Sequence, residues 1–173
     1  MIIGLSGKMG SGKSTIADLL KKYHSKNKAK IFKCAGPLYE IQNHIYDYLG
    51  LKLEGEKDRP LLIALGMWGR SKDENIWLNK AIQAAEEYSR NGGLAIIDDV
   101  RFENEAKAIE SVGLLVRLEG EQRGPNITPE SMNSPTETAL DKYDFKYVID
   151  NRVSVEQMGD KLNFIIDSYI NNY

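Results

Sequence analysis

Residues 7–14 carry the residue types that could hold a polyphosphate. They read Gly-Lys-Met-Gly-Ser-Gly-Lys-Ser and fit the pattern G-x-x-x-x-G-K-[ST] in full. Glycines let consecutive backbone N–H groups turn inward around a phosphate, and the N-terminus of the next helix adds partial positive charge. Lys13 would reach the β- and γ-phosphates, and Ser14 would place its hydroxyl on Mg²⁺. The predicted ATP-binding residues are Gly7, Lys8, Met9, Gly10, Ser11, Gly12, Lys13, Ser14 and Thr15.

Two acids at 98–99 form the second group of residues that could do chemistry. They follow the apolar segment 94–97, and an apolar strand ending in an acid is typical of the metal-binding strand of phosphate-loop proteins. Since side chains alternate along a strand, Asp98 and Asp99 must point in different directions. One is expected to face the loop and its Mg²⁺, the other to orient a loop or activate an acceptor. We favour Asp99 as the catalytic and metal-binding residue, then Asp98; the alternative is a pair of turn-forming acids.

Arginines near these acids could hold a second anion. Arg101 follows Asp99 by two residues. Arg70 ends the short segment Met67-Trp68-Gly69-Arg70, which combines an aromatic ring, a glycine and a cation. An enzyme that brings two polyanions into contact needs several cations in one cleft. Arg101 and Arg70 are therefore the leading candidates, whereas other arginines are more commonly surface ion pairs.

The remaining composition excludes several classes of function. The chain has 173 residues, 42% of them apolar, and a formal net charge of −2. These values predict one globular domain with no bulk electrostatic attraction to nucleic acid or to an acidic membrane. The apolar runs are too short to span a bilayer, and the phosphate loop lies too near Met1 for a signal peptide. We expect a cytoplasmic protein (host cytoplasm if phage-encoded), a monomer or homodimer, with small-molecule nucleotides as partners.

Hydrophobic periodicity predicts the elements that position these residues. Short apolar segments predict five strands, at 1–6, 29–35, 94–97, 114–118 and 145–149. Helical patterns lie between and after them: one follows the phosphate loop, and others are expected at 36–49, from 58 to a break at Gly66, at 75–90, from 103 to about 112, and from 154 onward. This alternation predicts an α/β fold with a five-stranded, mostly parallel sheet covered by helices on both faces. Ligands of such sheets bind beyond the carboxyl ends of the strands.

Longer stretches of the sequence resemble a known family. Residues 99–106 (DVRFENEA) resemble the D-V-R-F-x-N-E signature of bacteriophage-type deoxynucleoside monophosphate kinases. The pairs 65–66 and 69–70, and the segment 75–77, are similar to the middle region of that family. Residues 134–140 (SPTETAL) and 144–151 (DFKYVIDN) resemble its later segments. The similarity extends over nearly the whole chain.

The resemblance implies a three-layer nucleoside monophosphate kinase fold in one domain over 1–173, with an acceptor region at about 36–90 and a lid at about 119–138. It implies transfer of the ATP γ-phosphate to a deoxynucleoside 5′-monophosphate with Mg²⁺. Lys13 would carry the transferring phosphoryl group, and Arg123 would close over ATP. The implied acceptor-binding residues are Arg70, Trp68, Arg101, Phe102, Trp77 and Glu137.

Two other functions remain open on the sequence. A phosphate-loop kinase of another small acceptor, such as dephospho-coenzyme A, would have a similar N-terminal segment. A nucleotide-dependent switch or regulatory ATPase would also carry the loop, although the chain has no N-K-x-D guanine-reading motif. The segments around Trp68 and Asp99 favour a nucleotide acceptor.

Overall fold

Five parallel strands form the central sheet of the computed structural model, which describes residues 1–24, 28–123, 132–133 and 135–171. Their spatial order is β2-β3-β1-β4-β5. This sheet confirms the predicted α/β class, and every pairing among the described strands is parallel. The strands are β1 (Ile2–Gly7), β2 (Ala29–Phe32), β3 (Leu94–Val100), β4 (Leu114–Glu119) and β5 (Val148–Asp150).

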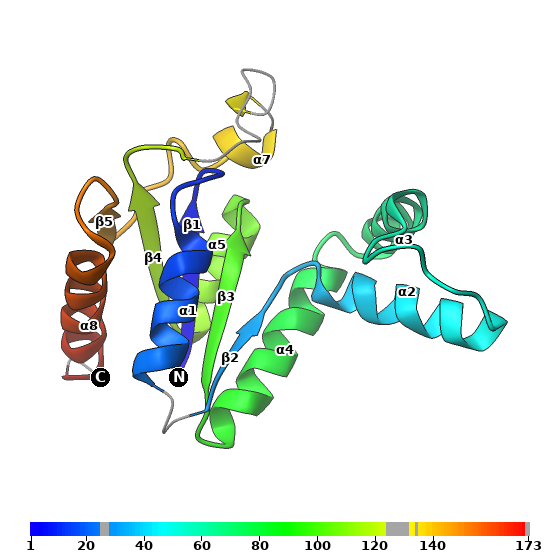
Figure 1. The fold of residues 1–173 in the computed structure, drawn as a ribbon, viewed down its shortest axis with the longest axis horizontal. Coiled ribbons are helices and arrows are strands. Elements are labelled where there is room, and N and C mark those ends of the chain that lie inside the picture. Colours follow the sequence, from blue (N-terminus) through cyan, green and yellow to red (C-terminus); the bar gives the residue numbers. More distant parts are fainter. Residues whose placement is uncertain (25–27, 124–131, 134, 172–173) are drawn as a thin grey trace.

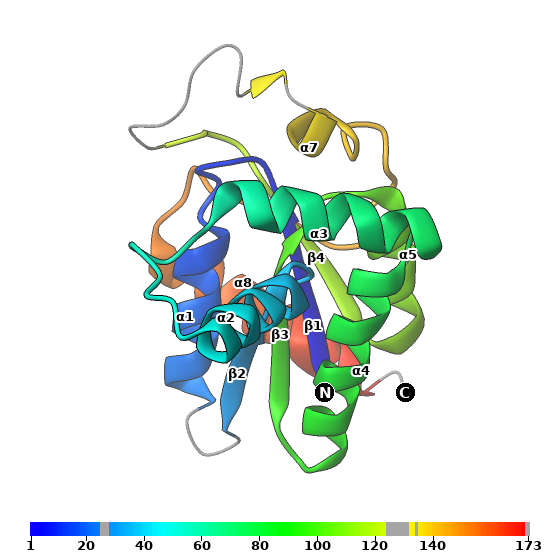
Figure 2. The same ribbon diagram turned by 90° about the vertical axis from the view of Figure 1, so that its right-hand side faces the viewer.

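Helices cover both faces of this sheet (Figure 1). One face packs against α1 and α8, and the other against α4 and α5. Two further helices, α2 and α3, pack on each other and on α4, and they extend beyond the β2 edge of the sheet (Figures 1 and 2). Within the described ranges, every helix is too short or too polar to cross a lipid bilayer. The helices are α1 (Lys13–Tyr23), α2 (Gly36–Leu49), α3 (Arg59–Lys72), α4 (Ile76–Arg90), α5 (Glu103–Val112), α7 (Pro135–Thr138) and α8 (Val155–Asn171).

Two hydrophobic clusters, one on each face, hold the layers together. Alternate residues of a strand enter opposite clusters, as the two-residue period of a strand requires. In β3, Leu94 and Ile96 pack in the cluster under α1 and α8, whereas Ala95 and Ile97 pack in the cluster under α4 and α5. All four residues are buried, so β3 has apolar side chains on both faces, as is typical of a central parallel strand.

Two strands near the site end at other residues than predicted. The second strand ends at Phe32 instead of Ala35, because Cys34 donates its backbone N–H to Asp99 and the chain turns into α2. The third strand extends through both acids to Val100. Residues 124–131 and 134 of the predicted lid lie outside the described residues.

The predicted helix break at Gly66 is wrong. Helix α3 continues through Gly66 and Gly69 to Lys72, and both glycines are buried. A Cβ atom on Gly69 would lie 2.2 Å from Cζ2 of Trp77, and the Trp77 indole donates to the Gly66 carbonyl at 3.3 Å. Gly69 therefore lets the indole of α4 lie directly against the α3 backbone, and neither glycine terminates the helix.

This contact predicts opposite effects of alanine at the two glycines. Gly69→Ala should lower the free energy of unfolding by about 1–3 kcal/mol, because the new methyl group overlaps the Trp77 ring. Gly66→Ala is the matched control: its Cβ would meet only the flexible end of Arg70 at 3.2 Å, and alanine gains about 1 kcal/mol of helix propensity over glycine. Urea denaturation followed by circular dichroism measures both changes. Equal stability of the two variants would contradict the packing role of Gly69.

Candidate active site

The phosphate loop joins β1 to α1, in the strand–loop–helix context that the sequence predicts. Gly10 has φ +74°, and the backbone of Arg123 lies against it so closely that a Cβ would stand 2.3 Å from the Arg123 carbonyl oxygen. Gly12, with φ +93°, immediately precedes the first turn of α1. Both positions need glycine, the first for space and backbone conformation and the second for conformation. The loop residues 9–15 line a cleft of about 470 Å³.

Lys13 lies inside this loop with only 8% of its surface exposed. Its Nζ donates to the carbonyl oxygens of Gly7 at 2.5 Å and Lys8 at 2.9 Å. Burial, followed by repulsion from Arg101, lowers the pKa of Lys13 to about 8, although nearby Glu137 opposes that shift. A buried ammonium group with a neutral fraction near physiological pH therefore lies at the base of the cleft.

The two acids at the end of β3 have different partners, as strand alternation predicts. Asp98 is 5% exposed and accepts a 2.7 Å bond from Lys33, whereas Asp99 accepts the Cys34 N–H at 2.9 Å. Burial raises the pKa of the Asp99 carboxyl. Both acids line the phosphate-loop cleft, but only Asp98 also lines, together with Ser14, a neighbouring cavity of about 810 Å³. Within the phosphate-loop cleft, Asp98 therefore lies on the same side as Ser14, and Asp99 lies on the opposite side.

A second cavity of about 630 Å³ opens on that opposite side. It shares Asp99 and Arg101 with the phosphate-loop cleft, so the two hollows adjoin at these residues. Among the residues predicted to bind an acceptor, those that line this cavity are Arg70, Trp77, Arg101 and Phe102.

Trp68 and Glu137, also predicted to bind an acceptor, are not among the lining residues of this cavity. Trp68 is 58% exposed. Because α3 continues through this segment, residues two apart on it point in nearly opposite directions, and Arg70 faces the cavity while Trp68 does not. Glu137 instead pairs with Arg101 and accepts the Met9 N–H.

Glu105 fixes the turn that presents Arg101. Its carboxylate accepts the backbone N–H groups of Arg101 at 2.7 Å and Phe102 at 3.1 Å, at the start of α5. Burial raises the pKa of Glu105. The residue lies inside the segment that resembles the family signature, but the sequence alone assigned it no role. A glutamate at the third position of a helix is the signal that could have revealed it.

Asn151 and Gln122 hold the segment after β4 on the phosphate loop. Asn151, 3% exposed, donates to the carbonyl oxygens of Ser11 at 3.1 Å and Glu121 at 2.6 Å, and it accepts the Glu121 N–H at 2.7 Å. Gln122 donates to the Met9 carbonyl at 3.0 Å. Neither role was predicted from the sequence, where Asn151 is a polar residue two positions after an expected strand.

Arg123, the residue expected to close over ATP, lines the phosphate-loop cleft. Its backbone N–H donates to the Gly10 carbonyl at 3.1 Å, and its guanidinium pairs with Glu121 at 3.0 Å. Val155 and Met158 line the same cleft, so it has an apolar end as well as a phosphate-binding end.

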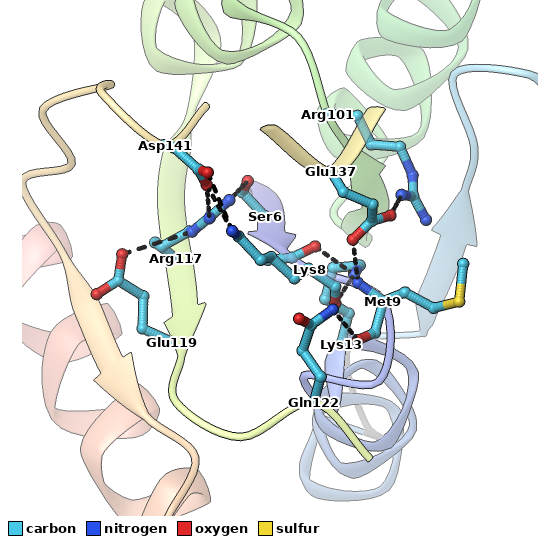
Figure 3. A network of polar contacts seen from close by, with 11 residues as sticks. Ser6, Lys8, Met9, Lys13, Arg101, Arg117, Glu119, Gln122, Glu137 and Asp141 are labelled. Carbon is cyan, nitrogen blue, oxygen red and sulfur yellow. Dashed lines mark hydrogen bonds and ion pairs between the residues drawn. The ribbon is translucent and has the colours of Figure 1, made fainter. Parts of the chain in front are cut away.

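Figure 3 shows the polar network around the loop. Lys8 pairs with Asp141 at 3.0 Å, and the buried Arg117 donates to Ser6 at 3.1 Å below the loop. Glu137 bridges Arg101 and the Met9 backbone. Four segments far apart in the sequence therefore meet around the phosphate loop: the end of β1, the residues after β3, β4, and the region of α7.

Within the described residues no group of three or more His, Cys, Asp or Glu side chains could hold a metal ion. An ion held by phosphates and one or two protein oxygens needs no such group. Mg²⁺ is commonly bound in that way, and the oxygens of Ser14 and Asp98 fit its preference for hard ligands.

Several solved structures with a similar fold are kinases. Shikimate kinase from Aquifex aeolicus superposes with a TM-score of 0.53 at 15% identity, covering 98% of each chain. A sugar kinase from Janibacter gives 0.52 at 17% identity, over 96% of this chain and 94% of that one. Deoxyadenosine kinase from M. mycoides with bound dATP gives 0.51 at 15% identity, over 96% and 100%. These similarities confirm the predicted phosphate-loop kinase fold.

Sequence comparison gives two further similarities. The uncharacterized protein ORF77 of Ictalurid herpesvirus 1 (strain Auburn) is 33% identical over 143 residues, which are 82% of this chain; the chain spans 59% of the length of that protein. A family model described as phosphomevalonate kinase matches residues 5–113. Because this match covers more than half of the chain and includes the phosphate loop, both acids and Arg101, the protein belongs to the phosphomevalonate kinase family.

Proposed function

We propose that this kinase transfers the γ-phosphoryl group of ATP to the phosphate of a deoxynucleoside 5′-monophosphate, giving ADP and a deoxynucleoside diphosphate. The observation that carries the proposal is the junction of two cavities at Asp99 and Arg101. One cavity is bounded by the phosphate loop, and the other by a second arginine and two aromatic rings. A donor phosphate and an acceptor phosphate could meet at this junction.

ATP would bind with its phosphates in the loop and its base toward Val155 and Met158. Lys13 would hold the transferring phosphoryl group. Ser14 and Asp98 would hold Mg²⁺, which would supply positive charge to the reacting phosphates. Asp98 is buried and lines the same neighbouring cavity as Ser14, so it is the better metal ligand of the two acids.

The acceptor cavity suits a phosphomonoester. Arg70 and Arg101 offer two guanidinium groups, which bind phosphate in a forked geometry. Trp77 and Phe102 line the same cavity and offer ring faces to a nucleobase. In the reaction, an acceptor phosphate oxygen forms a bond to the γ-phosphorus while the bond from that phosphorus to the β-bridging oxygen breaks, and ADP leaves.

Phosphomevalonate is the second candidate acceptor, because the matching family model carries its name. It is also a phosphomonoester, so both arginines would serve it equally. It has no ring to stack on Trp77 or Phe102, which favours the nucleotide. Dephospho-coenzyme A and acceptor-independent ATP hydrolysis remain as further outcomes of an assay.

The direct test is a coupled ADP-release assay with Mg²⁺-ATP and each candidate acceptor in turn. Production of a diphosphate from at least one deoxynucleoside monophosphate is expected, at a rate well above that without an acceptor. Turnover with phosphomevalonate or dephospho-coenzyme A alone would reject the proposed acceptor. A rate independent of every acceptor would reject phosphoryl transfer to these compounds.

Removal of the loop ammonium should abolish transfer without unfolding the protein. Lys13→Met is expected to lower kcat by at least about a thousandfold, because the phosphoryl group loses its closest cation. Lys22→Met, on the exposed end of α1, removes the same charge outside the cleft and should leave kcat unchanged. Circular dichroism checks both folds. Retention of kcat in a folded Lys13→Met protein would contradict the assignment.

Substitution of Arg70 and of Arg101 should have different effects on KM and kcat. Arg70→Ala should raise the acceptor KM by roughly 10–100-fold, the range of a lost bond to a charged group, and leave the ATP KM unchanged. Arg101→Ala should also lower kcat, since Arg101 borders both cavities. Arg90→Ala, an exposed residue of α4, is the control. A changed KM for ATP in Arg70→Ala would contradict the assignment of Arg70 to the acceptor.

ATP binding should weaken above pH 8. Burial holds the pKa of Lys13 at about 8, so the free protein loses this charge as the pH rises through 8, whereas bound triphosphate favours the protonated form. The Kd of a non-hydrolysable ATP analogue should therefore increase by up to about tenfold per pH unit between 8 and 9.5. Arginine stays charged in this range, so Lys13→Arg should give a flatter profile. Calorimetric titration measures both, and a flat wild-type profile would refute the linkage.

A further inference from the structure

Glu137 is a buried carboxylate that touches two proposed phosphate ligands at once. It is 3% exposed and comes from α7, far along the chain from the phosphate loop. One carboxylate oxygen accepts the backbone N–H of Met9, at the loop, and the other pairs with the guanidinium of Arg101 (Figure 3). These are oxygen-to-donor contacts of the kind that a phosphate group would make with the same atoms.

The Met9 N–H that binds Glu137 cannot donate to a substrate phosphate at the same time, because a backbone N–H has one hydrogen to donate. The Arg101 guanidinium has further N–H groups, but its contact with Glu137 through Nη1 offsets the positive charge that it offers at the phosphate-loop cleft. A carboxylate that remained beside the γ-phosphate would also repel it, and repulsion between buried charges is strong because water does not screen them. Bound triphosphate and the observed Glu137 contacts are therefore mutually unfavourable.

We propose that Glu137 couples the two substrates: its carboxylate competes with the ATP γ-phosphate for the Met9 N–H, and its displacement by ATP releases Arg101 to bind the acceptor phosphate. The role of Arg101 toward an acceptor rests on the proposed function. The competition with ATP does not, because it involves only the phosphate loop and the kinase assignment. The expected result is ordered binding, with ATP first.

A neighbouring contact lets Glu137 leave the loop while its segment stays attached. Asp141 lies four residues later and pairs with Lys8 at 3.0 Å and with Arg117 at 3.7 Å. The pair between Lys8 and Asp141 uses neither Glu137 nor the Met9 N–H, so it does not depend on the bond between them. Asp141 thus attaches the α7 region to the phosphate loop, and Glu137 binds the Met9 N–H and Arg101.

Three cations lie around Glu137: it pairs with Arg101 and acts electrostatically on Lys13 and Arg117. Lys13, Arg101 and Arg117 all raise the local potential, and the Glu137 charge in turn raises the pKa of Lys13 against the effect of burial. Within the described residues, Asp98 is the other acid that acts on Lys13 in this way. Removal of the Glu137 charge thus leaves a more positive cleft for ATP.

The test compares Glu137→Gln with the wild type by calorimetric binding, without turnover. The variant should bind a non-hydrolysable ATP analogue about tenfold more tightly, which corresponds to the lower part of the range for one bond to a charged group. It should also bind a deoxynucleoside monophosphate with similar affinity whether or not the analogue is present, whereas wild-type binding should strengthen at least several-fold with the analogue. Glu103→Gln removes an exposed acid of α5 that pairs with Lys107, and it should behave as the wild type.

Glu137→Asp provides a second variant in case glutamine perturbs the fold. The shorter side chain keeps the charge but cannot bridge both donors, so analogue affinity should lie between those of the wild type and Glu137→Gln. Analogue affinity that is unchanged or weaker in both folded variants would overturn the proposal and make Glu137 a support of the ATP-bound loop. If no monophosphate binds to any variant, the proposed acceptor fails, but the analogue affinities still decide whether Glu137 competes with ATP.

Discussion

The parallel pairing of β1 with β3 on one side and β4 on the other is the constraint on which the site depends. Ser6 pairs with Val100 and Gly7 with Leu118, so the three strands end at nearly the same level. The chain that follows each strand must then emerge at one edge: the phosphate loop, the turn at Arg101, and the segment that reaches Arg123. No contact between these loops would be possible if one strand ran in the opposite direction.

This convergence concentrates positive charge in a chain that is slightly acidic overall. The net charge is −2, yet Lys13, Arg101 and Arg117 lie close enough to influence one another around the phosphate loop. The buried acids Asp98 and Glu137 offset part of that charge. Incoming phosphates would replace the carboxylates as partners of the cations, so the same arrangement that stabilises the folded chain prepares the site for polyanions.

The sequence predicts those parts of the site that depend on local chemistry. The phosphate loop is recognisable because glycine, lysine and serine occupy fixed positions on one short segment, and the acids are recognisable because they end an apolar strand. Roles that arise from contacts between distant segments were missed. Nothing near Asn151 indicates that its amide would reach Ser11, 140 residues away, and nothing near Glu137 indicates that it would reach Met9.

Glycine in α3 illustrates the same limit for the fold. Local propensity disfavours glycine within a helix, and Gly66 followed by Gly69 reads as a helix end. At Gly69 the structure overrides that preference because the Trp77 indole fills the space that a side chain would need, and the same indole donates to the Gly66 carbonyl. Since Trp77 also lines the second cavity, Gly69 contributes to the shape of that cavity although it lies outside its lining.

The contacts of Asp99 bear on which acceptor would suit the second cavity. A hydroxyl acceptor must lose a proton during transfer, and an acid beside it commonly serves as the base. A phosphomonoester is largely ionised near neutral pH, since its second pKa is about 6, and its oxygen can attack without a base. Asp99 Oδ1 is engaged by the Cys34 N–H, and two arginines face the same cavity. The phosphate acceptor that we propose would therefore use these two cations and would need no base at Asp99.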